Sequence, residues 1–107
     1  MASVHLRGTL ELLLLAVIAP GPAHGYAVIA GLRERSDGDF DLPEGTVYPA
    51  LHKLEREGLV HSSWEVAAGR RRRVYALTEH GARALREQRQ EWVTFQRGVQ
   101  AVLALSM

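Results

Sequence analysis

The chain has 107 residues, of which 47% are hydrophobic and 23% are charged. A chain of this length can bury one packed core and is too short for two, so we expect a single small domain. Its 13 basic and 12 acidic residues leave a formal charge of +1, which excludes a uniformly polycationic DNA coat. Cysteine is absent, which excludes disulfides, thiolate zinc sites, iron–sulfur clusters and cysteine nucleophiles.

The most apolar segment is too short to cross a membrane. It covers residues 12–19, whereas a membrane-spanning helix needs about 20 apolar residues. An apolar run before Pro20 and Gly21 also imitates a secretory signal, but Glu11 and a weak positive flank favour a buried helix. We therefore expect a cytoplasmic protein that does not contact the membrane.

Two helices are predicted in the first third of the chain. Thr9 is a good N-cap for the first helix, which is apolar on almost every face and ends at Pro20. A second, amphipathic helix is expected from His24 to about Arg35. The all-round apolar character of the first helix predicts that it lies at the centre of the core.

A third helix is predicted between Pro43, which suits its first position, and Gly58, which ends it. Apolar residues recur along it at intervals of four and three, at Val47, Leu51 and Leu54, so this stripe should face the core. The remaining faces carry mostly polar side chains. These are Thr46, Tyr48, His52, Lys53 and Arg56.

The pattern then changes to that of a two-stranded hairpin. Residues 59–66 and 72–78 each hold β-branched or aromatic residues and are separated by small and basic ones. A final helix opens at Thr78 and Glu79, and its apolar residues follow a heptad pattern with Gln88 as the polar exception. The apolar positions are Leu85, Trp92, Phe95, Val99 and Val102.

Three helices followed by a hairpin is the order of a winged helix-turn-helix, so we expect an α+β, mostly helical fold. Residues 1–78 would form the DNA-binding domain, and residues 79–107 a long dimerisation helix in the same compact unit. In this fold the third helix enters the major groove and the hairpin, or wing, lies against the backbone or the minor groove. Residues 58–78 hold four arginines against one glutamate, so the positive charge gathers on the wing.

The arginine run is predicted to lie at the hairpin tip and at the start of the second strand. Guanidinium groups placed there could bind phosphates or enter a narrow minor groove. A solvated, solubilising turn is the alternative, and the preceding helix-turn-helix pattern favours DNA. The four residues are Arg70, Arg71, Arg72 and Arg73.

Several separated motifs occur in the order typical of one family. They are LRGTLELLLL (6–15), GPAHGY (21–26), LPEGTVYPALHKLEREGL (42–59) and YALTEHG (75–81). Together they resemble the PadR family of bacterial transcriptional regulators, in its short form with one C-terminal helix. The resemblance implies a homodimeric repressor that leaves a near-palindromic operator on double-stranded DNA when a small effector binds.

The resemblance also implies roles for single residues. Thr46 and Tyr48 lie in the GTxYP motif, where family members place groups that contact bases and phosphates, although a buried Tyr48 is the structural alternative. Lys53 and Arg56, three residues apart, could hold phosphates, or could pair with glutamates of the same helix. Arg7 could reach the DNA backbone or stay solvated.

The heptad stripe of the last helix would be exposed on so small a domain, which predicts that dimerisation buries it. Folding back onto its own domain is the alternative, expected for Leu85 at least. In some short PadR-like proteins, aromatic residues of paired terminal helices line a cavity for flat aromatic compounds. By this resemblance Trp92 and Phe95 are candidate effector-binding residues, and the fluorescence of Trp92 could report effector binding over an uninformative background from Trp64.

Two other classes of function fit the sequence less well. The sequence holds no HExxH, GxSxG, P-loop or dinucleotide-binding glycine motif, so neither an enzyme nor a cofactor is expected. Asp37, Asp39 and Asp41 alternate as in a calcium loop, but the glycine and glutamate that such a loop needs are missing. A winged helix that binds proteins instead of DNA stays open, and the basic wing disfavours it.

Overall fold

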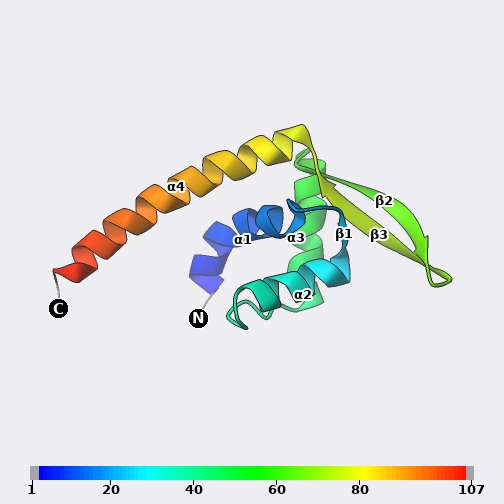
Figure 1. Cartoon of the computed structure of the whole chain (residues 1–107), viewed down its shortest axis with the longest axis horizontal. Helices are drawn as coiled ribbons and strands as arrows, with labels where there is room; N and C mark the ends of the chain where they lie inside the picture. Colours follow the sequence, from blue (N-terminus) through cyan, green and yellow to red (C-terminus); the bar gives the residue numbers. More distant parts are fainter. Residues whose placement is uncertain (1–2, 106–107) are drawn as a thin grey trace.

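The computed structural model describes the backbone of residues 3–105 and the side chains of residues 9–105. This part of the chain forms four helices and an antiparallel sheet with strand order β1-β3-β2 (Figure 1). The elements are α1 (Ser3–Ile18), β1 (Ala23–His24), α2 (Gly25–Arg35), α3 (Glu44–Arg56), β2 (Val60–Ala67), β3 (Arg70–Leu77) and α4 (Glu79–Ala104). The predicted α+β fold, with a helix-turn-helix, a wing and a long last helix, is confirmed.

The core lies where α1, α2 and α3 meet the base of the hairpin. The stripe predicted along α3 is buried, as expected from its helical spacing. The largest fully buried side chains are Leu14, Leu15, Ile18, Val28, Val47, Leu51 and Val60. Since α1 supplies three of these seven, its predicted central position is also confirmed.

The predicted start of the first helix was wrong. α1 begins at Ser3, so Thr9 lies inside the helix and does not cap it. The residues before Thr9 include no proline, and each can continue a helix. The gain from an N-cap, about 1 kcal/mol, does not end a helix that can propagate further.

The wing is a regular hairpin closed by a two-residue turn. Ala68 and Gly69 both have positive φ, at 53° and 76°, which defines the turn geometry that matches the twist of two antiparallel strands. Strand pairing therefore continues to Ala67↔Arg70. The second strand was expected to begin at Arg72, but it begins at Arg70, because the loop contains only two residues.

The four arginines consequently alternate between the two faces of β3. The strand register sets Arg73 opposite Trp64 and Arg72 opposite Glu65. Arg71 and Arg73 thus share a face with Trp64, while Arg70 and Arg72 share the other face with Glu65. The cluster that is contiguous in sequence is divided in two by the sheet.

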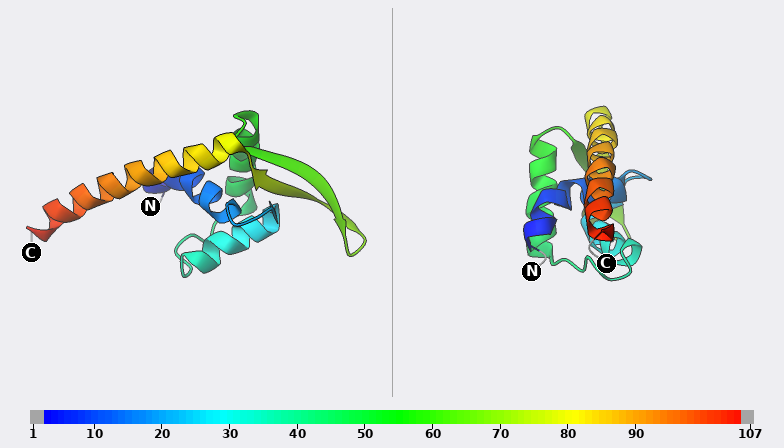
Figure 2. Two further views of the ribbon diagram at one scale, coloured as in Figure 1. Left: turned by 45° about the horizontal axis from the view of Figure 1, so that its top comes forward. Right: turned by 90° about the vertical axis from the view of Figure 1, so that its left-hand side faces the viewer.

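Among the described residues, the buried and half-buried part of α4 lies in its first three turns. The Thr78 hydroxyl accepts a hydrogen bond from the Gly81 N–H (2.9 Å) and donates one to the Gly58 carbonyl (2.6 Å), which fixes the start of the helix against the connection between α3 and β2. Leu85 is 7% exposed, as expected if it folds back on its own domain. From residue 89 on, every described residue of α4 is exposed, and the helix extends away from the body, opposite to the wing (Figure 1, Figure 2).

Candidate nucleic-acid interface

The outer face of α3 is polar and accessible. His52, Lys53 and Arg56 are exposed and Thr46 is half-buried, while the buried stripe occupies the opposite side. Among the described residues, neither Lys53 nor Arg56 takes part in an ion pair. The alternative that these cations pair with glutamates of their own helix is therefore wrong, and both remain available to an external anion.

Tyr48 lies on the flank of α3, between the core face and the outer face. Its half-buried ring packs on Gly25, where a Cβ atom would overlap it. Burial, together with the carboxylate of Glu44, raises the pKa of Tyr48, so the phenol stays neutral and can donate a hydrogen bond. The ring is thus a packing element, and the hydroxyl remains a hydrogen-bond donor.

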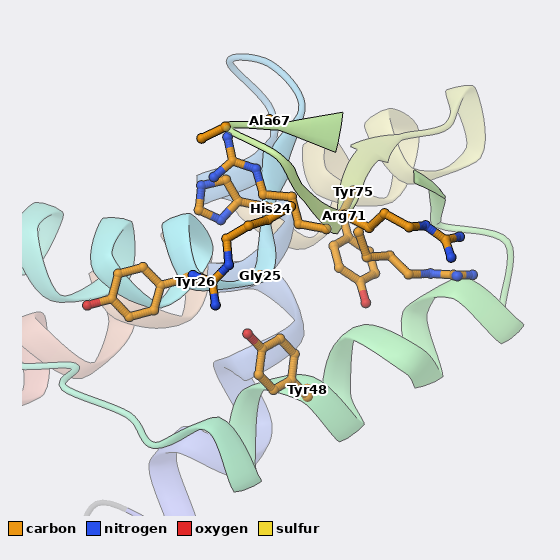
Figure 3. Close-up of a pocket in the computed structure, with 11 residues that line it drawn as sticks. His24, Gly25, Tyr26, Tyr48, Ala67, Arg71 and Tyr75 are labelled. Atoms are coloured by element: carbon orange, nitrogen blue, oxygen red, sulfur yellow. The ribbon is translucent and has the colours of Figure 1, made fainter. Parts of the chain in front are cut away.

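A hollow of about 610 Å³ separates the wing from the start of α2 and is bordered by α3 (Figure 3). Tyr48 enters it from α3 and Tyr75 from β3, and all four wing arginines line it. His24 caps α2 by accepting a hydrogen bond from the Ala27 N–H at 3.3 Å. Tyr26, the second residue of α2, also borders the hollow and is 64% exposed.

The wing arginines differ in how their charges are compensated. Arg72 pairs with Glu65 at 3.6 Å, and Arg73 lies 4.0 Å from Glu55 and donates to Ser62 at 2.8 Å. No carboxylate pairs with Arg70 or Arg71 in the part of the chain that the structure describes. The uncompensated positive charge of the wing therefore lies at the turn end of β3.

Two residues of this region, Glu55 and Ser62, carried no signal in the sequence. The Trp64 ring is 55% exposed and lies under two guanidinium groups, those of Arg71 and Arg73. This contact of Trp64 was not predicted from the sequence. The alternation of β2 against β3 could have revealed this contact, but only once the turn had fixed the register.

The predicted stripe on α4 is accessible in the single chain. Trp92 is 41% and Phe95 65% exposed, and their ring centroids lie 6.1 Å apart. Val99 and Val102 continue the stripe. A hollow of about 340 Å³ between α1 and α4 is lined on its α4 side by Trp92 and Phe95, and Gln88 donates across it to Glu11 at 3.4 Å.

The structure also bears on the expectations for Arg7, for membrane-spanning helices and for metal sites. The side chain of Arg7 lies outside the residues that the structure describes. None of the described helices is long and apolar enough to cross a membrane. Within residues 9–105, no three His, Asp or Glu side chains come together as a metal site would require, and the alternating aspartates form an exposed loop.

An accessible third helix beside a basic wing defines the winged helix-turn-helix class of regulators. Residues 14–87 match the family described as "Transcriptional regulator PadR-like family". Transcriptional regulator Rv3488 of Mycobacterium tuberculosis is 39% identical over 83 residues, which cover 78% of this chain and 75% of the relative. The chain therefore belongs to the PadR-like family of transcriptional regulators, and it is not an enzyme.

Solved structures agree with this assignment. A PadR family regulator from Eggerthella lenta superposes with a TM-score of 0.83 at 33% identity, covering 96% of this chain and 88% of that one. Bacillus subtilis PadR, solved in complex with operator DNA, shares the fold with a TM-score of 0.69 at 22% identity, covering 75% of this chain and 46% of that one.

Proposed function

We propose that this regulator is a homodimeric repressor that binds a specific, near-palindromic operator in the cytoplasm. The observation that carries the proposal is the shared hollow, where α3 and the arginines of the wing border the same space. In this arrangement α3 would enter the major groove with Thr46, Tyr48, His52, Lys53 and Arg56, while the wing would follow the backbone. The operator complex of Bacillus subtilis PadR, which has the same fold, supports this assignment.

The dimer would form through the exposed stripe of α4. Trp92, Phe95, Val99 and Val102 form an apolar face that a second copy can cover with its own stripe. Residues 79–107 would then serve as the dimerisation helix and residues 1–78 as the DNA-binding part. Two α3 helices about 34 Å apart would meet successive major grooves.

The effector site would lie beside the same helix. The hollow between α1 and α4 offers two aromatic rings, Trp92 and Phe95, to a flat aromatic compound. A ligand that favours one arrangement of the dimer would change the spacing of the two α3 helices and so weaken DNA binding. Calorimetric titration with acridine should show binding to the wild type and loss of binding in Trp92→Ala, and equal affinities would contradict this site.

Selection from a pool of random duplexes tests the DNA-binding proposal. The purified protein should enrich a two-fold related sequence whose half-sites are centred about 10 base pairs, or a multiple of this, apart. Enrichment of an unrelated single site would contradict the dimeric arrangement. A pool that stays random would contradict sequence-specific binding and favour the protein-binding alternative.

A further inference from the structure

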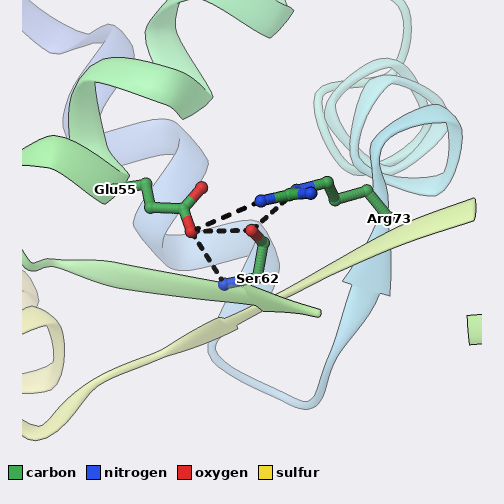
Figure 4. A network of polar contacts seen from close by, with 3 residues as sticks. All are labelled: Glu55, Ser62 and Arg73. Carbon is green, nitrogen blue, oxygen red and sulfur yellow. Dashed lines mark hydrogen bonds and ion pairs between the residues drawn. The ribbon is translucent and has the colours of Figure 1, made fainter. Parts of the chain in front are cut away.

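A polar cluster connects α3 to both strands of the wing (Figure 4). Oε2 of Glu55, on α3, accepts hydrogen bonds from the Ser62 hydroxyl (2.7 Å) and the Ser62 backbone N–H (3.3 Å) on β2. From β3, Nε of Arg73 donates to the same hydroxyl at 2.8 Å, and its guanidinium lies 4.0 Å from Glu55. A single carboxylate thus holds both strands of the wing against α3.

The cluster continues outward through Trp64. Because residues opposite one another in a strand pair share a face, Trp64 lies on the same face as Arg73. The guanidinium carbon of Arg73 is 5.0 Å from the centre of the Trp64 ring, and that of Arg71 is 4.4 Å from it. Cations at these distances are attracted to the face of the indole.

We propose that Glu55 is a positioning residue for DNA binding. Through Ser62 and Arg73 it fixes the wing relative to α3, and Trp64 carries this constraint to Arg71. Arg71, which has no carboxylate partner among the described residues, is thereby presented to a DNA phosphate. The inference rests on the proposed DNA-binding function and assigns different tasks to neighbouring arginines: Arg73 is internal to the wing, and Arg71 faces the ligand.

The direction in which one substitution changes operator affinity distinguishes a positioning role from simple electrostatic repulsion. A carboxylate near a DNA-binding surface repels phosphates, so its removal should tighten binding if it has no other task. Glu55→Gln keeps the size of the side chain and a hydrogen-bond acceptor but loses the charge that holds Arg73. Positioning therefore predicts weaker operator binding although the protein has become more positive.

Glu57→Gln is the matched control. Glu57 lies two residues further along at the end of α3, is exposed, and forms no ion pair within the described residues. Both variants change the net charge equally. We expect operator affinity, measured by fluorescence anisotropy, to fall about 3- to 10-fold in Glu55→Gln and to stay equal or rise slightly in Glu57→Gln.

Three outcomes distinguish a failure of the proposed function from a failure of the positioning role of Glu55. If the wild type shows no preference for any DNA sequence, the proposed function fails, and the positioning role fails with it. If the wild type binds its operator and Glu55→Gln binds equally or more tightly, only the positioning role is overturned. If Glu55→Gln weakens operator binding while Glu57→Gln does not, the positioning role is supported.

The fluorescence of Trp64 gives a readout that does not depend on DNA. The chain has two tryptophans, so Trp92→Phe leaves Trp64 as the reporter. In that background, Glu55→Gln should make the ring more accessible to acrylamide than Glu57→Gln does, because Arg73 and Arg71 lose their fixed places. Equal quenching in the two variants, with circular dichroism showing both folded, would overturn the link between Glu55 and Trp64.

Discussion

The ring of Tyr48 on α3 packs directly against Gly25, the first residue of α2. The contact joins two sequence motifs, GPAHGY and GTVYP, at one point of the fold. It also fixes Tyr48 beside the hollow that the wing borders. Only glycine fits at this position of α2, because any Cβ atom would overlap the phenol ring.

Gly25→Ala should therefore destabilise the protein. Overpacking of a well-packed site costs about 1–3 kcal/mol, and the cost should fall when Tyr48→Ala removes the ring. Gly45→Ala is the control, because a Cβ atom there meets open space on α3 and should stabilise by about 0.5–1 kcal/mol. Urea unfolding measures Gly25→Ala, Tyr48→Ala, the double variant and Gly45→Ala, and equal effects of Gly25→Ala with and without the ring would contradict the contact.

The stability contributed by Glu55 should depend on pH. Its hydrogen bond from the Ser62 hydroxyl is the main reason that the pKa of Glu55 lies below its ordinary value of 4.5, and the nearby Arg73 adds to the effect. When the pKa of a carboxyl is lower in the folded state than in the unfolded state, its ionised form stabilises the fold. This stabilisation is complete above the pKa of the unfolded state and is lost as the pH falls through the pKa of the folded state.

The free energies of unfolding of the wild type and Glu55→Gln should thus differ most at neutral pH, and the difference should shrink as the pH falls below 4.5, through the lowered pKa of Glu55. Urea titrations at several pH values measure the difference in the free energy of unfolding. A difference that stays constant across this range would show that the charge of Glu55 does not stabilise the fold.

The α4 stripe makes a separate prediction about assembly. Phe95→Glu would place a charge in the proposed dimer interface, where desolvation without a partner is costly. We expect light scattering to give about twice the chain mass of 11.9 kDa for the wild type and the single-chain mass for the variant. Ala101→Glu, on the opposite side of α4 by helical geometry, should remain dimeric, and two dimeric variants would exclude this interface.

The wing arginines should differ in their contribution to the salt dependence of DNA binding. Arg71→Ala should reduce the number of ions released by about 0.9, since one phosphate contact is lost. Arg72→Ala removes the same formal charge but should change the slope of log affinity against log salt concentration less, because Glu65 already compensates Arg72. Equal slopes for the two variants in binding titrations would contradict this division.

The sequence alone predicted those features of the fold that depend on a single helical periodicity. The spacing of Val47, Leu51 and Leu54 determines the buried face of α3 because a helix returns to the same side after three or four residues. The extent of the wing was not predictable in this way, because Ala68 carries no signal for its positive φ. The register follows from that turn, and the contacts of Glu55 and Trp64 follow from the register.

Binding to DNA across a salt series tests the central claim most directly. Fluorescence anisotropy would compare the intergenic DNA upstream of the protein's own gene with a scrambled duplex of equal length and composition. The account predicts preference for the native sequence and a steep loss of affinity with salt, by about 0.9 ions released for each phosphate contact. Weak binding to both duplexes that hardly changes with salt would contradict a DNA-binding regulator.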